Sequence, residues 1–172
     1  MAEVGADAVT HRRVAQVADL PLASTTYWFE SKEQLLTAAL ERAADRDIAC
    51  LQAFLDRAPK PPSDPLELAV DAILDAGDEP LQALRGSLVA AYALMLEAAR
   101  RPSLGAVTRR WTDAYVQALA RLLASAGSSD PSGDAALLLA AADGLLLERL
   151  AADEAFELRP QLRRLATALV AA

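Results

Sequence analysis

Cysteine and histidine are almost missing from this 172-residue chain, which contains one of each. Cys50 has no second cysteine to pair with, and residues 1–8 lack an apolar run behind a positive charge. The pattern therefore predicts a cytoplasmic protein without disulfides or a signal peptide. A lone histidine and a lone cysteine provide neither a metal-binding cluster nor a Cys–His nucleophile pair, and no Gly-rich phosphate loop is present. The sequence predicts no enzyme, no cofactor and no metal site.

Hydrophobic runs long enough to cross a membrane are also missing, although 53% of the residues are hydrophobic. The most apolar segment, AALLLAAADGLLLERL at 135–150, is too short for a span and is interrupted by Asp143. Because it is apolar on almost every face, we expect its own domain to cover one side and a second molecule the other. With the preceding helix it predicts half of a four-helix homodimer bundle. The predicted interface residues are Leu119, Leu122, Leu137, Ala140, Ala141, Gly144 and Leu145.

Proline, glycine and hydrophobic periodicity predict an all-α fold. Ser31 and Gln34 form a capping box that opens a helix running to about residue 58, where a proline-rich loop ends it. Hydrophobic residues at helical spacing predict the remaining helices. These are placed at 66–76, 84–100, 106–126 and 134–150 and from Pro160 onward, with a short segment around Leu81.

The segment VTHRRVAQVADLPLASTTYWFESK, residues 9–32, predicts two short helices joined by a tight turn. Thr10 caps the first helix, and Pro21 forces a break before the second, which covers about 22–29. Helices joined so closely cross steeply, as in a helix-turn-helix. The second helix is rich in small, hydroxylated and aromatic residues, which suit contacts with phosphates and base edges better than a scaffold role. A packed corner with Tyr27 and Trp28 in its core is the alternative.

This segment, extended to VTHRRVAQVADLPLASTTYWFESKEQL, resembles the DNA-binding segment of the tetracycline-repressor (TetR) family of bacterial transcriptional regulators. The matching positions follow the family's pattern in order from Thr10 to Lys32. The detailed match covers about the first fifth of the chain. The remainder resembles the family in being all helical and in segments such as ADGLLLERL. The resemblance implies a dimer with two helix-turn-helix units and a helical domain that binds a small-molecule effector.

The resemblance also implies which residues contact double-stranded operator DNA. Arg12 is the best candidate for a guanine contact, because a guanidinium group bonds O6 and N7 together. Lys32 is expected to hold a phosphate with the amide groups that open the next helix. The predicted DNA-binding residues are Thr10, His11, Arg12, Ala23, Ser24, Thr26, Tyr27, Trp28 and Lys32.

The sequence departs from the family's pattern in two ways. Thr26 occupies a slot that is most often tyrosine, and Thr25 occupies one that is usually apolar. In addition, the basic, amphipathic first helix of the family is largely missing ahead of residue 9. We expect the apolar sides of the two remaining short helices to lose a cover.

An excess of basic charge is missing as well, since 17 Lys and Arg residues stand against 24 Asp and Glu residues, a net charge of −7. Phosphate attraction acts over about one Debye length, roughly 8 Å in physiological salt, so local charge matters most. Near the motif, Arg12, Arg13 and Lys32 are balanced by nearby carboxylates. We expect weak non-specific DNA binding and reliance on the paired contacts of a dimer.

An effector pocket is the least specified feature. Tyr92, Met95, Trp111 and Tyr115 are candidates to line it among the central helices, although such residues at helical spacing are more often core. Asp143, like Asp113, is a polar group on an otherwise apolar helix. Solvent exposure or a structural hydrogen bond is the main expectation for each, and an effector contact is the alternative.

Together these patterns predict an all-α regulator. Residues 1–45 form the helix-turn-helix DNA-binding domain, and 46–172 form a helical effector-binding and dimerisation domain. The predicted function is a repressor that binds a palindromic operator as a homodimer and is released by a small molecule. The alternative is a helical dimer that no longer binds DNA and acts as a small-molecule-binding or protein-interaction module.

Overall fold

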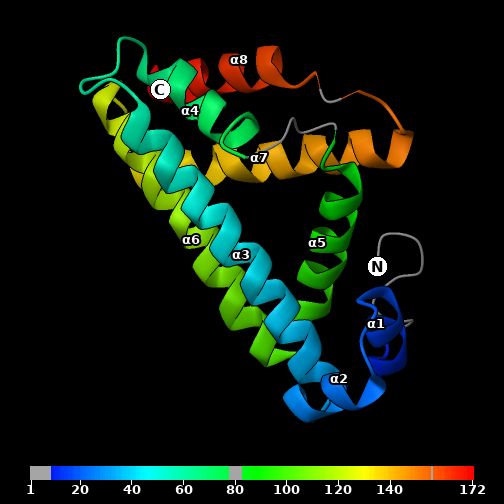
Figure 1. Ribbon diagram of the computed structural model, residues 1–172. Coiled ribbons are helices and arrows are strands. Elements are labelled where there is room, and N and C mark those ends of the chain that lie inside the picture. The colour runs from blue at the N-terminus through cyan, green and yellow to red at the C-terminus, as the bar shows by residue number, and fades with distance from the viewer. Residues whose placement is uncertain (1–8, 78–82, 156) are drawn as a thin grey trace. The chain divides into compact units, whose positions relative to one another are not determined.

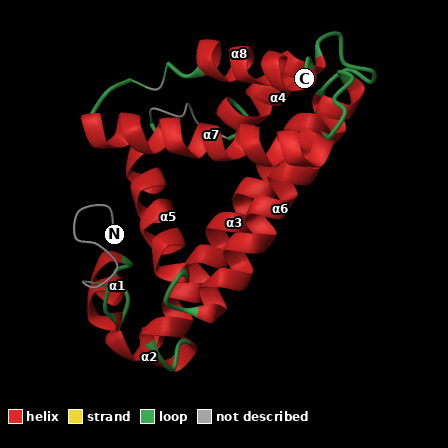
Figure 2. Ribbon diagram, turned by 180° about the vertical axis from the view of Figure 1, so that it is seen from behind, coloured by secondary structure: helices red, strands yellow, loops and turns green. Residues whose placement is uncertain are grey.

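The computed structural model describes residues 9–77, 83–155 and 157–172, and every regular element in them is an α-helix (Figures 1 and 2). This confirms the predicted all-α class. The segment expected around Leu81 lies outside the described residues. The helices are α1 (His11–Val17), α2 (Leu22–Trp28), α3 (Lys32–Arg57), α4 (Pro65–Leu74), α5 (Arg85–Ala98), α6 (Pro102–Ser125), α7 (Pro131–Ala152) and α8 (Arg159–Val170).

Side-chain caps start several of these helices where the sequence predicted them. Thr10 Oγ1 accepts a hydrogen bond from the Arg13 amide at 3.2 Å, which confirms the cap of α1. Ser31 Oγ accepts from the Gln34 amide at 3.2 Å. The Gln34 side chain reaches back to the amide of Glu30 at 2.8 Å, one residue before the expected partner. The reciprocal cap that opens α3 is therefore present with its register shifted by one amide.

The chain folds into two compact units. The first contains residues 1–46 and 86–110, and the second contains 47–85 and 111–172. Helices α3 and α6 each run through both units. The functional division at residue 45 stays a prediction.

In the second unit, α8 packs against both α4 and α7 (Figure 1). Leu158, Leu162 and Ala166 follow one another at helical spacing and are fully buried. On α4, which contacts α8, Ala69 and Val70 are also fully buried. The amphipathic last helix predicted from Pro160 is confirmed, and it begins at Arg159.

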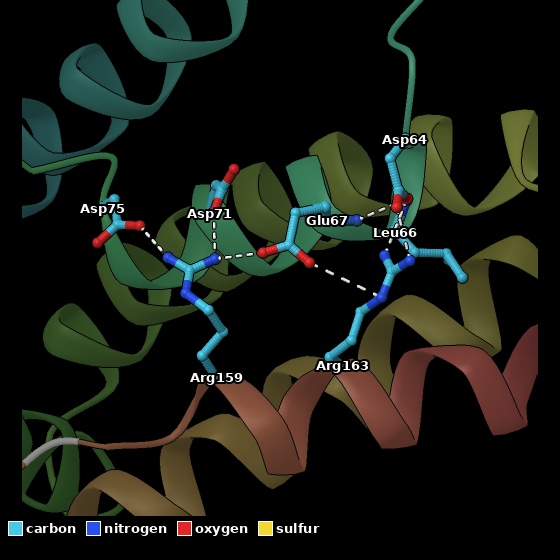
Figure 3. Close-up of polar contacts among 7 residues, drawn as sticks. All are labelled: Asp64, Leu66, Glu67, Asp71, Asp75, Arg159 and Arg163. Carbon is cyan, nitrogen blue, oxygen red and sulfur yellow. Dashed lines mark hydrogen bonds and ion pairs between the residues drawn. The ribbon is translucent and has the colours of Figure 1, made fainter.

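Two arginines of α8 join it to the acidic face of α4 (Figure 3). Arg159 pairs with Glu67 at 2.6 Å and also with Asp71 and Asp75. Arg163 donates to both carboxylate oxygens of Asp64, at 2.8 and 2.6 Å. The Arg163 guanidinium, and then the Glu67 amide, lower the pKa of Asp64 from its ordinary 3.8 to about 2.

We expect this arginine pair to make unfolding sensitive to acid. Because the folded pKa of Asp64 is depressed, its contribution is present above about pH 4 and is lost as the pH falls toward 2. Arg163→Met should lower the melting temperature at pH 7 and flatten its decline between pH 4 and 2. The effect should be modest, since Asp64 is partly exposed. Thermal unfolding across this range tests it, with Arg164→Met on the exposed side of α8 as the control; identical pH profiles for wild type and Arg163→Met would contradict it.

Candidate functional site

The first two helices form the tight corner that the sequence predicted (Figure 2). The chain reverses at Asp19, which has a φ of 53° in the left-handed region that aspartate tolerates better than most residues. The Leu20 amide closes the turn by donating to the Ala15 carbonyl at 2.9 Å. Ala15 of α1 is buried, and α1 and α2 are in contact. The helix-turn-helix geometry is therefore built from local bonds and a small buried contact.

Thr25 links α2 to α1 through a buried hydroxyl group. Its side chain is 5% exposed, and Oγ1 lies 2.9 Å from the Leu22 carbonyl and 3.3 Å from the His11 carbonyl. The first contact lies within α2, and the second crosses to the first turn of α1. A polar residue in this usually apolar slot is thus satisfied by backbone carbonyls.

Removing this hydroxyl should loosen the corner. Thr25→Val keeps the β-branched shape and should lower the free energy of unfolding by about 1 kcal/mol, because the interhelical hydrogen bond is lost. Amide exchange in α1 should accelerate. Thr26→Val is the matched control, since the exposed Thr26 hydroxyl bonds only within α2. Equal effects of the two substitutions would show that the bond to His11 does not hold the corner.

The predicted recognition helix presents two large aromatic side chains to solvent. Tyr27 is 78% exposed and Trp28 is 74% exposed. Their ring centroids are 5.2 Å apart at an interplanar angle of 89°, an edge-to-face pair. Ala23 and Thr26 are exposed on the same helix, and Ser24 is half-buried. The packed-corner alternative is therefore wrong for Tyr27 and Trp28, which do not fill the core of this chain.

The remaining predicted DNA-binding residues divide by exposure. Thr10 and Arg12 are exposed, whereas His11 and Lys32 are half-buried. His11 Nδ1 is buried without a hydrogen-bond partner. The contact of His11 with DNA stays a prediction. The exposed charge on α1 comes from Arg12 and its neighbour Arg13.

A polar cluster lies in the second unit around Asp47 of α3. Trp111 Nε1 on α6 donates to Asp47 Oδ2 at 2.6 Å. Burial of the Tyr115 hydroxyl, followed by the charge of Asp47 and its hydrogen bond, raises the pKa of Tyr115 well above its ordinary value. Asp143 of α7 adds to this negative potential. Trp111 and Tyr115 therefore share one carboxylate, a role for Asp47 that no sequence pattern indicated.

The other two candidate pocket residues, Tyr92 and Met95, lie on α5 in the first unit and are half-buried. A pocket lined by all four residues stays a prediction. Asp113 is exposed, as expected for a solvated carboxylate.

Helix α7 exposes an apolar stripe. Leu137 and Leu147 are 58% and 44% exposed, and Ala140 and Gly144 between them are also exposed. The spacing of three, four and three residues places them on one helical face. A Cβ atom built on Gly144 meets nothing within 4 Å, so this face is open in the single chain.

The burial of one residue argues against part of the predicted dimer interface. Leu119 of α6 is 0% exposed and belongs to the core of its own unit, so a partner chain cannot reach its side chain. Leu122, Ala141 and Leu145 are half-buried. Leu147, which the sequence prediction did not include, lies three residues after Gly144 and continues the exposed stripe.

In the described part of the chain, no helix is long and apolar enough to cross a membrane. The histidine, cysteine and acidic side chains of this part form no group of three or more that would hold a metal ion.

Comparison with known proteins assigns the family. Residues 64–172 match the family described as tetracyclin repressor-like, C-terminal domain. The chain belongs to the TetR family. The resemblance drawn from the helix-turn-helix segment is confirmed by a match that covers most of the rest of the chain. As a TetR-family member, the protein is a transcriptional regulator with an N-terminal helix-turn-helix and a helical C-terminal domain.

Solved structures of TetR-like regulators have the same fold. A transcriptional regulator from Rhodococcus sp. Rha1 is 24% identical, with a TM-score of 0.80 over 99% of this chain and 89% of its own. The multidrug binding protein EbrR complexed with ethidium is 32% identical, with a TM-score of 0.67 over 94% of this chain and 86% of its own. EbrR complexed with proflavin is 28% identical, with a TM-score of 0.66 over 98% and 91%. Among curated proteins, none matches the chain.

Proposed function

We propose that this TetR-family protein is a repressor that binds a near-palindromic operator as a homodimer and is released by a small molecule. The observation that carries the proposal is the solvent-exposed aromatic pair Tyr27 and Trp28 on a short helix held by a helix-turn-helix corner. Two large rings left in water on a small helix are best explained by a partner that covers them. In a dimer, two such helices would enter major grooves about 34–36 Å apart.

The α7 stripe supports the homodimer. Leu137 and Leu147 flank the small residues Ala140 and Gly144 on an open face. A two-fold axis passing over this face would bring the stripe against its own copy, which is how an isologous interface is built. Small residues at its centre would let the two backbones approach closely.

The Asp47 cluster supports an effector that is aromatic and positively charged. Trp111 and Tyr115 offer ring surfaces, and Asp47 offers a carboxylate between them. Ethidium and proflavin, the ligands in the EbrR complexes, are planar aromatic cations. Aromatic faces together with a carboxylate are the chemistry that attracts such ligands. We infer that the effector of this protein belongs to the same chemical class.

Helix α6 offers a route from the effector to the DNA-binding unit. Near its start, Ser103 donates to Glu33 at 2.8 Å and accepts from Thr37 at 3.4 Å, both on α3. These contacts border a groove of about 550 Å³ that also includes Phe29. The same helix continues to Trp111 in the second unit. A shift of α6 on effector binding would thus act on the first turns of α3, directly after the recognition helix.

Fluorescence of a single tryptophan tests the effector assignment. In Trp28→Phe protein, Trp111 remains as the reporter, and ethidium or proflavin should quench it at micromolar concentrations. Asp47→Asn should weaken this binding about tenfold, since a charged partner is lost. Asp113→Asn, at an exposed carboxylate on the same helix as Trp111, is the control.

The thermodynamic linkage between dye binding and operator binding provides a second test of the effector assignment. With the wild-type chain and equal free dye, held by equilibrium dialysis because both dyes also intercalate into DNA, saturating operator DNA must weaken dye binding by the same factor by which the dye weakens operator binding. Dye binding without this reciprocity would favour a small-molecule-binding module that does not regulate DNA. Absence of quenching by both dyes would contradict the proposed effector class.

A further inference from the structure

The outward side of α2 is uncharged along its whole length. Leu22 is 48% exposed, Ala23, Thr26, Tyr27 and Trp28 are exposed in the same helix, and Ser24 is half-buried. Its polar groups are hydroxyl groups and the indole N–H of Trp28. No charged or amide side chain occurs in LPLASTTYW, residues 20–28. The helix expected to read DNA therefore lacks every side chain that makes a bidentate hydrogen bond to guanine or adenine.

The threonine hydroxyl groups do not replace those side chains as donors. Thr25 Oγ1 is buried and lies against the Leu22 and His11 carbonyls. Thr26 Oγ1 donates toward the Leu22 carbonyl at 3.3 Å and the Ala23 carbonyl at 3.2 Å. A hydroxyl group has one proton to donate. Because the Thr26 proton is used within α2, the side chain presents to a partner its methyl group and an oxygen that can only accept hydrogen bonds.

The methyl group of thymine is the feature of the major groove that matches the uncharged surface of α2. The C5-methyl group of thymine is the apolar mark on the base edges, and small apolar side chains contact it directly. The positive charge needed beside phosphates comes from the neighbouring helix, where Arg12 and Arg13 are exposed. The chemistry divides accordingly: α1 supplies the cations, and α2 supplies the apolar contacts.

We propose that α2 selects its operator through thymine methyl groups, contacted by Leu22, Ala23, Thr26 and the aromatic pair. The occupant of this surface is double-stranded DNA with thymines facing α2 in each half-site. The inference rests on the proposed function, because it requires that the protein binds a specific duplex. It adds the base chemistry that makes the binding specific.

Replacing thymine by uracil is the direct test. An operator is first selected from a pool of random duplexes with the full chain. Each thymidine of that operator is then replaced singly by deoxyuridine, which lacks the methyl group and keeps the hydrogen-bonding edge. We expect at least one position in each half-site to lose about fourfold in affinity, the effect of one buried methyl group.

A protein variant assigns the contact to α2. Leu22→Ala should bind the parent operator more weakly and respond less to uracil at one position, because the partner of that methyl is gone. Val17→Ala is the matched control: Val17 is 80% exposed but lies on α1, and its substitution should leave the uracil response unchanged.

Two other outcomes would separate a failure of methyl recognition from a failure of operator binding. If an operator is selected but uracil is tolerated at every thymine, methyl recognition is wrong while operator binding stands. If no sequence is enriched from the pool, the proposed function itself fails, and this inference fails with it.

Discussion

Replacing Trp28 by alanine is expected to weaken operator binding at least about 30-fold while the fold and the dimer persist. Trp28 is 74% exposed, and its ring contact is with Tyr27, which is also exposed. Little of the protein core is therefore lost with the ring. A base contact contributes about 1–3 kcal/mol, and a dimer has two copies, so a loss of about 2 kcal/mol or more corresponds to this factor.

Fluorescence anisotropy with a labelled operator measures this change. Leu96→Ala is a suitable control, because Leu96 is 75% exposed on α5, outside the helix-turn-helix. It should bind operator like wild type. Circular dichroism and light scattering should be unchanged for both variants. Unchanged operator affinity in Trp28→Ala would remove this residue from the DNA-reading surface.

Placing a charge at Ala140 is expected to dissociate the dimer. Ala140 lies in the exposed α7 stripe between Leu137 and Gly144. In an isologous interface, Ala140→Glu introduces two carboxylates near the two-fold axis, each without a partner and facing a like charge. An uncompensated buried charge costs on the order of 3–5 kcal/mol, so the dimer dissociation constant should rise more than about a hundredfold. Operator affinity should fall with it.

Sedimentation velocity over a range of protein concentrations follows the dissociation. Ala53→Glu makes the same change at an exposed alanine of α3 and should remain dimeric. Helical content near that of wild type would show that the Ala140→Glu monomer is folded. A dimer of undiminished affinity would place the interface elsewhere than on the α7 stripe.

The helix starts could be predicted because their signals are local. Thr10 and Ser31 accept hydrogen bonds from amides three residues later, and both spacings are visible in the sequence. The start of α6 was predicted at about residue 106, whereas the helix begins at Pro102. Proline fits the first turn of a helix, and α6 begins with it.

Contacts between distant segments carried no such signal. Arg159 and Arg163 contact carboxylates that lie far earlier in the chain, on α4, and helical periodicity does not pair them. Leu119 was assigned to the dimer interface because an apolar position on a helix does not reveal which molecule covers it. The structure shows that the chain itself buries the Leu119 side chain completely.

The chemistry of the recognition helix was only half predictable. Its aromatic exposure followed from the motif, but Thr26 was expected to contact DNA and Thr25 was noted only as a polar residue in a usually apolar slot. Threonine in a helix commonly bonds the carbonyl three or four residues back, and both residues do so here. That local rule was available from the sequence and would have predicted that the threonine protons are used within α2.

The central claim is that this TetR-family protein binds a specific operator as a dimer. Binding of the chain to DNA from its own promoter region, titrated at several salt concentrations, tests it most directly. We predict two protomers per site and a salt slope no steeper than about −5, since Arg12, Arg13 and Lys32 supply the positive charge around α1 and α2. Equal affinity for unrelated DNA of the same length, or no binding in low salt, would contradict the account.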